Sequence, residues 1–192
     1  MKMIKKEVVF YVLVIAVTTI IKIICAPNIA LSGATGILAV ALFTGLNKAY
    51  NTRNAFLLPL AALLISNTVL QLLHSLNMFP FEGFYKWQLA EYSLVVVLTA
   101  VGMLFRKAKT AGVFIAAFAG PTLFYIISNY ITWAVSWQAM GYTHDMPGLM
   151  NCYVQGLPFY RNSLISTVIM LPAIILAYRW IVMRKAGFAL VK

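Results

Sequence analysis

Charged residues are scarce in this sequence, and acidic residues are the scarcest of all. Only 10% of the 192 residues are charged, with four Asp or Glu against fifteen Lys or Arg, while 62% are hydrophobic. A soluble domain carries about 25% charged and about 45–50% apolar residues, because its surface needs polar cover even at this size. The composition therefore excludes ordinary globular and disordered proteins, and it indicates a surface that largely contacts an apolar solvent.

The sequence also lacks the motifs of common enzymes. It contains no GxSxG, no HExxH and no P-loop, which are signatures of serine hydrolases, zinc proteases and nucleotide hydrolases. The acidic residues are too few and too scattered to favour an acid–base pair. We therefore expect a protein that is not an enzyme and that needs no cofactor. An intramembrane enzyme is the weaker alternative, and it would need Cys152 and His144 in contact as nucleophile and base.

Cysteine is rare as well. Cys25 and Cys152 are far apart in the sequence and form no CxxC-type metal motif. Two unpaired thiols within apolar segments are the simpler interpretation. A disulfide between them stays open if both lie on the outer side of a membrane.

Long apolar runs make up most of the sequence. Six of them predict membrane-spanning helices, since a span needs about 20 residues. The first run resembles a signal peptide, but Lys22 interrupts it before any cleavage site, so we interpret it as the first helix. The second is short and rich in small residues. No hydrophilic stretch is long enough for another domain, so we expect one all-α transmembrane domain over residues 1–192. The predicted spans cover about residues 8–25, 29–46, 55–76, 87–105, 111–135 and 157–183.

The basic residues divide unequally between the two sides that six spans create. Three of them, Lys22, Lys86 and Arg161, fall on the side away from the termini. Positive charge gathers on the cytoplasmic side of membrane proteins, so we expect both termini in the cytoplasm and a bacterial inner-membrane location. Charges dispersed in this way do not indicate nucleic-acid binding. The residues on the side of the termini are Lys2, Lys5, Lys6, Lys48, Arg53, Arg106, Lys107, Lys109, Arg179, Arg184, Lys185 and Lys192.

Small residues recur every four positions just before and within the fifth predicted span, at Ala108, Gly112, Ala116 and Gly120. Such spacing lets helix backbones approach closely in lipid. We interpret the stripe as internal bundle packing, with docking of a partner helix as the alternative.

Polar residues within the spans are informative because burying them in lipid is costly. Asn67, Gln71 and His74 follow the i, i+4, i+7 spacing of one helical face, and the outer ends of other spans carry further polar and aromatic residues. This pattern predicts an outward-facing pocket, and interhelical hydrogen bonds that only hold the bundle are the alternative. We expect Glu91 to pair with Arg161 or Lys86. The predicted pocket residues are Asn67, Gln71, His74, Glu91, Asn129, Trp133, Asn151, Tyr153 and Asn162.

Four stretches carry a resemblance to a known group of proteins. They are APNIALSGATGILAVALFTG (26–45), RNAFLLPLAALLISN (53–67), FYIISNYITW (124–133) and GLMNCYVQGLPFYRNSL (148–164). Together they resemble a family of small bacterial membrane proteins that is allied to the substrate-binding S-components of energy-coupling factor (ECF) vitamin transporters. The resemblance extends over most of the chain, and the last stretch is its most specific part.

The resemblance implies an S-component-like bundle that captures a vitamin from the outer side. Most S-components work with separate coupling and ATPase subunits, whereas BtuM-like cobalamin transporters act alone. Among vitamins we favour a corrinoid, because His74 or Cys152 could face a cobalt centre. The expected function is therefore binding and uptake of a small micronutrient in the lipid bilayer. A structural or assembly protein of the inner membrane is the alternative.

Reporter fusions test the predicted topology. Fusions after Lys48, Arg106 and Lys192 should report a cytoplasmic location, and a fusion near His144 should report an external one, because basic residues gather on the cytoplasmic side. Paired alkaline phosphatase and fluorescent-protein reporters measure this directly. An external C-terminus would contradict the six-span count.

Overall fold

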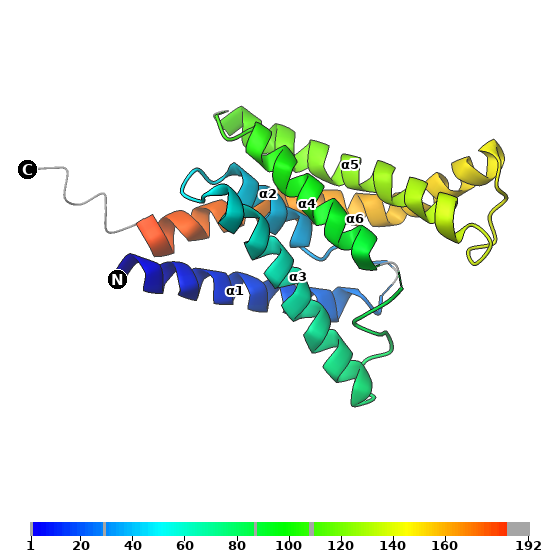
Figure 1. Cartoon of the computed structure of the whole chain (residues 1–192), viewed down its shortest axis with the longest axis horizontal. Coiled ribbons are helices and arrows are strands. Elements are labelled where there is room, and N and C mark those ends of the chain that lie inside the picture. Colours follow the sequence, from blue (N-terminus) through cyan, green and yellow to red (C-terminus); the bar gives the residue numbers. More distant parts are fainter. Residues whose placement is uncertain (1, 29, 87, 108–109, 184–192) are drawn as a thin grey trace, which may run out of the picture.

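The chain folds as a bundle of helices (Figure 1). The structure is a computed structural model that describes residues 2–28, 30–86, 88–107 and 110–183. The helices are α1 (Lys2–Cys25), α2 (Ile37–Leu46), α3 (Thr52–Ser75), α4 (Gln88–Leu104), α5 (Thr110–Ser136) and α6 (Met146–Tyr178), which continues as a π-helical turn, η1 (Arg179–Met183).

Four of these helices are long and apolar enough to cross a membrane. They comprise Lys6–Cys25, Thr52–Ser75, Ala111–Ser136 and Met146–Met183. The helices Ile37–Leu46 and Gln88–Leu104 are apolar but shorter. Within the described residues the structure therefore confirms an all-helical fold with six helices, of which four are long and apolar enough to span a membrane, and it does not confirm six transmembrane helices.

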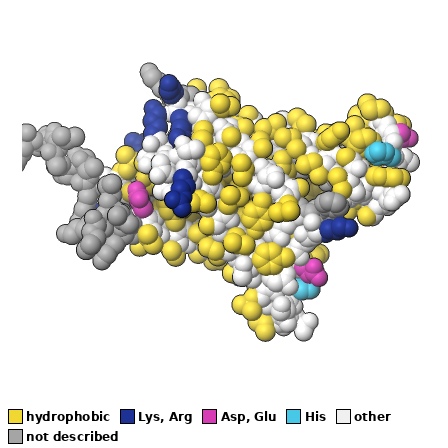
Figure 2. All heavy atoms as spheres, viewed as in Figure 1, with side chains coloured by type: hydrophobic (Ala, Val, Ile, Leu, Met, Phe, Trp, Pro, Cys, Tyr) yellow, Lys and Arg dark blue, Asp and Glu magenta, His cyan; other side chains and the backbone are white. Residues whose placement is uncertain are grey.

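Successive helices run in alternating directions. The start of α1, the α2–α3 and α4–α5 connections and the end of α6 lie at one end of the molecule, which we call the terminal end (Figure 1). The α3–α4 and α5–α6 connections lie at the opposite side, the distal end. Side chains of Lys and Arg gather at the terminal end (Figure 2).

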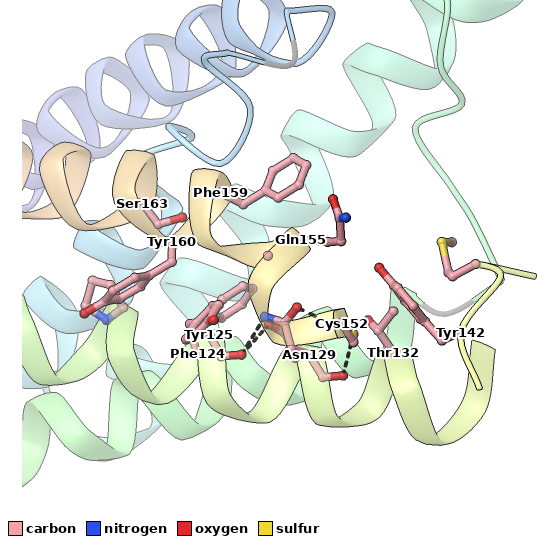
Figure 3. A pocket seen from close by; sticks show the side chains of 14 residues that line it. Phe124, Tyr125, Asn129, Thr132, Tyr142, Cys152, Gln155, Phe159, Tyr160 and Ser163 are labelled. Carbon is pink, nitrogen blue, oxygen red and sulfur yellow. Dashed lines mark hydrogen bonds between the residues drawn. The ribbon is translucent and has the colours of Figure 1, made fainter. Parts of the chain in front are cut away.

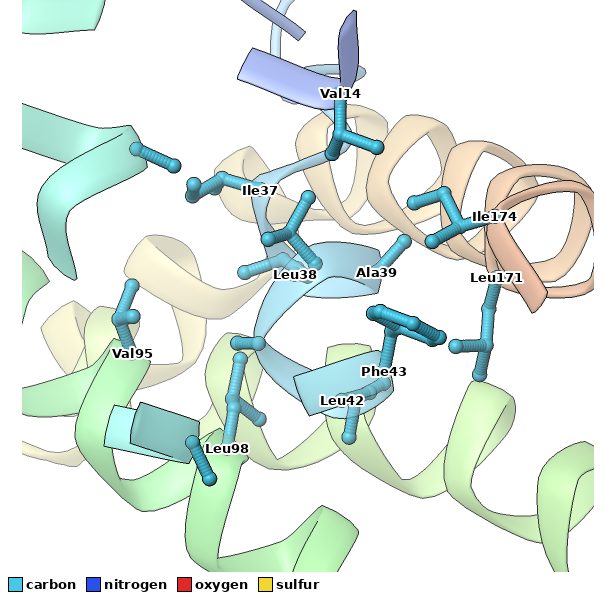
Figure 4. Packing of buried hydrophobic residues seen from close by; sticks show 14 of the residues in the cluster. Val14, Ile37, Leu38, Ala39, Leu42, Phe43, Val95, Leu98, Leu171 and Ile174 are labelled. Carbon is cyan, nitrogen blue, oxygen red and sulfur yellow. The ribbon is translucent and has the colours of Figure 1, made fainter. Parts of the chain in front are cut away.

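Helix α2 lies at the centre of the bundle and is much shorter than the span expected for residues 29–46. It has ten residues, of which nine are buried, and contacts α3, α4, α5 and α6. Leu38 and Phe43 of α2 pack among Leu98 of α4 and Leu171 and Ile174 of α6 (Figure 4). At 1.5 Å per residue α2 is about 15 Å long, roughly half of a hydrocarbon core.

Small residues allow the close packing around α2. A Cβ atom on Gly102 of α4 would lie 2.6 Å from the carbonyl oxygen of Leu42 and 3.0 Å from the Cα atom of Gly45. A Cβ atom on Gly120 of α5 would lie 2.7 Å from Leu42 Cδ1. With Ala116 also fully buried, the stripe on α5 packs inside the bundle. Its first predicted member, Ala108, lies outside the described residues.

Helix α6 begins at Met146, earlier than the expected start at about residue 157. Asp145 caps it, because the Asp145 side chain accepts a hydrogen bond of 2.8 Å from the Gly148 N–H, and Pro147 suits the first helical turn. Hydrogen bonds from the Thr143 hydroxyl and the Gly148 N–H hold the pKa of Asp145 below its usual value.

Replacement of Gly102 by leucine tests the packing of α4 on α2. The added side chain would meet backbone atoms that cannot move aside, so Gly102→Leu should lower the free energy of unfolding by about 1–3 kcal/mol. Thermal unfolding in detergent measures the effect. Ala100→Leu is the matched control, since Ala100 is an exposed residue of the same helix. Equal melting temperatures for the two variants would show that α4 does not pack on α2 in this way.

Candidate functional site

A two-lobed cavity lies among α4, α5 and α6. One lobe, the α5–α6 lobe, has a volume of about 260 Å³. The other, the α4–α5 lobe, has a volume of about 340 Å³. Phe124, Ser128, Thr132 and Met140 line both lobes, so the two spaces adjoin along one face of α5.

The α5–α6 lobe has aromatic walls with a few polar groups between them (Figure 3). The rings of Tyr125 and Tyr160 stack with their centroids 4.8 Å apart. The Tyr160 hydroxyl lies 2.9 Å from the Thr122 hydroxyl, which fixes the ring against α5. Gln155 and Ser163 of α6 add polar side chains to the opposite wall.

Asn129 lies in this wall because α6 carries a glycine opposite it. The Asn129 Nδ2 donates to the Tyr125 carbonyl at 2.8 Å, and the thiol of Cys152, which is 1% exposed, donates to the Asn129 carbonyl at 3.4 Å. A Cβ atom on Gly156 would lie 2.8 Å from Asn129 Nδ2. Glycine at position 156 therefore makes room for the Asn129 amide at the lobe.

The α4–α5 lobe is more apolar, and it contains a carboxylate. Among the described residues that line the two lobes, Glu91 is the one with a charged side chain. The Tyr85 hydroxyl donates to Glu91 Oε2 at 2.8 Å. The remaining wall is formed mainly by aliphatic residues such as Leu94, Ile131 and Val135.

A lysine of α1 contributes a second charged group, outside the described walls of the two lobes. Lys22 Nζ donates a hydrogen bond to the side-chain oxygen of Asn67 on α3, and the Lys22 charge interacts electrostatically with Glu91 on α4. Asn67 is 1% exposed, so α1 and α3 meet at a buried polar contact. The sequence carries one signal for this arrangement, a lysine inside an apolar run.

Gln71 and His74 bind the α3–α4 connection. Gln71 Oε1 accepts hydrogen bonds from the Gly83 and Phe84 N–H groups at 3.0 and 3.2 Å. His74 Nδ1 donates to the Phe79 carbonyl at 3.0 Å, which fixes this nitrogen as the protonated one. Both side chains therefore brace a connection, and neither is among the residues that line the two lobes.

Asn162 has a similar bracing role at the segment before α2. Its Nδ2 donates to the Ala30 and Ser32 carbonyls at 2.8 and 2.9 Å, and the neighbouring Ser163 hydroxyl donates to the Gly33 carbonyl at 3.0 Å. Non-helical backbone within a membrane protein needs such partners, because lipid offers none. The Asn162 amide thus supplies hydrogen-bond donors to backbone carbonyl groups of the non-helical segment before α2.

The remaining predicted residues lie around the α5–α6 turn. Trp133 stacks on His144 with centroids 4.6 Å apart, and its Nε1 donates to the Thr143 carbonyl at 3.0 Å. The Tyr153 hydroxyl donates to the Ile126 carbonyl at 2.8 Å, and Asn151 is exposed. Of the nine predicted pocket residues, the structure brings Asn129 and Glu91 to the walls of the cavity.

The described residues offer no obvious metal centre. No group of three or more His, Cys, Asp or Glu side chains gathers within them. His74 binds the α3–α4 connection, whereas Cys152 lies in the wall of the α5–α6 lobe. Cys25 and Cys152 are both free thiols.

Comparison with protein families matches one family model over residues 2–189. The chain belongs to the DUF6580 family, a family of unknown function. No curated protein matches the chain, and no solved structure does. The comparisons thus establish DUF6580 membership and no link to the ECF S-components, so a function for this DUF6580 protein rests on its own geometry.

Two asparagines of α6 test whether Asn162 stabilises the segment before α2, because Asn162 bonds to that segment and Asn151 is exposed. Asn162→Leu should lower the free energy of unfolding by about 1–3 kcal/mol, because it removes the donors from two loop carbonyls. Asn151→Leu should have little effect, since Asn151 is exposed. Thermal unfolding in detergent compares them. Equal stability of the two variants would show that Asn162 does not hold the segment before α2.

Proposed function

We propose that this protein binds a small micronutrient within the membrane and takes part in its uptake, with the two-lobed cavity as the binding site. The observation that carries the proposal is the cavity itself. Ordinary small-molecule sites occupy about 300–1,000 Å³ and combine apolar walls with a few polar groups. Adjoining lobes of about 260 and 340 Å³ are compatible with this range.

The walls favour an amphipathic ring compound. Tyr125, Tyr160 and Phe124 offer aromatic faces, while Asn129 and Gln155 offer amide groups that can bond to a polar edge. A vitamin-sized molecule with a flat ring suits both properties. A corrinoid suits them less well, because its macrocycle with side chains is larger than either lobe; of its two alternative cobalt-facing residues, Cys152 lines the α5–α6 lobe and His74 lies outside both lobes.

The distribution of charge supports an orientation. Basic side chains gather at the terminal end (Figure 2), and the cytoplasmic side of membrane proteins is the basic one. We therefore place both termini in the cytoplasm of a bacterial cell, the protein in the inner membrane, and the α5–α6 turn on the outer side. On this orientation the cavity receives its ligand from outside.

Lipid and energising subunits complete the proposed partners. Large apolar side chains such as Val8, Val12 and Ile20 of α1 are half exposed, which is expected for residues that contact lipid. Uptake needs an energy source, and the protein has no nucleotide-binding motif of its own. It works either alone, as a carrier that follows the ligand gradient, or with ECF-type coupling and ATPase subunits.

A tryptophan at the shared wall tests the proposal. Ser128 lines both lobes, so Ser128→Trp should fill the space and abolish ligand retention. Native mass spectrometry of the protein purified from its own membrane measures retained small molecules. Ile126→Trp is the matched control, because Ile126 lies on the same helix, is 47% exposed and is outside both lobes.

The proposal expects a bound small molecule on the parent and on Ile126→Trp but none on Ser128→Trp, with melting temperatures that show all three to be folded. Retention by Ser128→Trp would place the ligand elsewhere. Should the parent retain no molecule, and should cells with and without it take up micronutrients equally, the structural or assembly alternative would replace the uptake function.

A further inference from the structure

The charge of Glu91 raises the question of which ligand the α4–α5 lobe accepts. Glu91 is half-buried and faces a lobe whose other described walls are uncharged. A carboxylate away from water is costly unless it is hydrogen-bonded and opposed by a positive charge. Its one described hydrogen bond comes from the Tyr85 hydroxyl, which is a neutral donor.

The opposing positive charge comes from Lys22, but indirectly. Lys22 directs its hydrogen bond to the Asn67 amide oxygen on α3, so it acts on Glu91 through its field rather than as a described hydrogen-bond donor. Lys22 is absent from the walls of both lobes, whereas Glu91 lines one of them. The carboxylate therefore faces the cavity, whereas Lys22 lies outside the described cavity walls.

We propose that the α4–α5 lobe selects ligands that carry a basic amine, with Glu91 as the hydrogen-bond acceptor for the ammonium group and Lys22 as the resident charge that opposes it. This inference rests on the proposed function and names the chemical class of its ligand. The aromatic ring of such a ligand would lie toward Phe124 at the wall common to both lobes. A charge-assisted hydrogen bond is stronger than a neutral one, so Glu91 discriminates an amine from a neutral analogue of the same size.

The arrangement predicts opposite effects for the two charges. Removal of the Glu91 charge takes away the attraction for the ammonium group. Removal of the Lys22 charge takes away the repulsion between Lys22 and the ligand's ammonium group. It also leaves the Glu91 carboxylate without its resident counter-charge. A residue that merely stabilised the fold would affect charged and neutral ligands equally.

Two matched probes make this measurable: phenethylamine, which is cationic at neutral pH, and 2-phenylethanol, its neutral analogue. Titration calorimetry with the protein in lipid nanodiscs gives both dissociation constants, and empty nanodiscs correct for partition into lipid. Glu91→Gln keeps an acceptor for the Tyr85 hydroxyl, and Lys22→Gln keeps a donor for Asn67. Glu82→Gln and Arg161→Gln are controls that change the same charges at exposed positions.

The parent should bind phenethylamine more tightly than 2-phenylethanol. Glu91→Gln should weaken phenethylamine binding roughly tenfold, Lys22→Gln should tighten it roughly threefold, and neither should change 2-phenylethanol binding. The controls should behave as the parent does.

Equal affinity of the parent for the two probes, or an unchanged preference in Glu91→Gln, would overturn the selection of amines while leaving a binding cavity in place. Weaker phenethylamine binding by Lys22→Gln would overturn the opposing role of Lys22. If the parent binds neither probe, the inference fails; if it also retains no small molecule on purification, the proposed function fails with it.

Discussion

A short helix buried at the centre imposes the main constraint on this fold. Helix α2 has ten residues, nine of them buried, and at about 15 Å it covers roughly half of a membrane crossing. The segment that leads into it is non-helical, and its carbonyl groups need donors inside the protein. Asn162 and Ser163 of α6 provide them, across more than a hundred residues of sequence.

The cavity lies apart from this central packing. Helix α2 packs closely on Gly102 of α4 and on Gly120 of α5. The cavity lies along a different stretch of α5, from Phe124 to Thr132, opposite residues 152–163 of α6. Close packing around α2 and open space between α4, α5 and α6 therefore occupy different stretches of α5.

The sequence predicts the class of the protein well because that depends on bulk properties. Scarce charge and long apolar runs indicate helices that are apolar enough to cross a membrane, and the four-residue spacing of Ala116 and Gly120 identifies a packing face. The start of α6 was also readable, since Asp145 and Pro147 are ordinary signals for the first turn of a helix. Gly148 and Gly156, which are poor helix formers, obscured them.

The partners of the polar residues could not be predicted in the same way. Helical spacing shows that Asn67, Gln71 and His74 share a face, but not what that face meets. Two of them meet backbone groups of a connection, and irregular backbone leaves no pattern in a sequence. Asn67 meets Lys22, whose position inside an apolar run was the available clue. Asn129 lies at the cavity because Gly156 makes room opposite it, a pairing that only the fold creates.

The central claim is that space between α4, α5 and α6 holds a small molecule. An experimental structure of the protein in lipid nanodiscs, purified without removal of bound compounds, tests it most directly. The account predicts density that belongs to no residue of the chain, bounded by Phe124, Ser128 and Thr132 of α5. Helices that close on one another there, with these three side chains in contact with α4 and α6 and no space between, would contradict it.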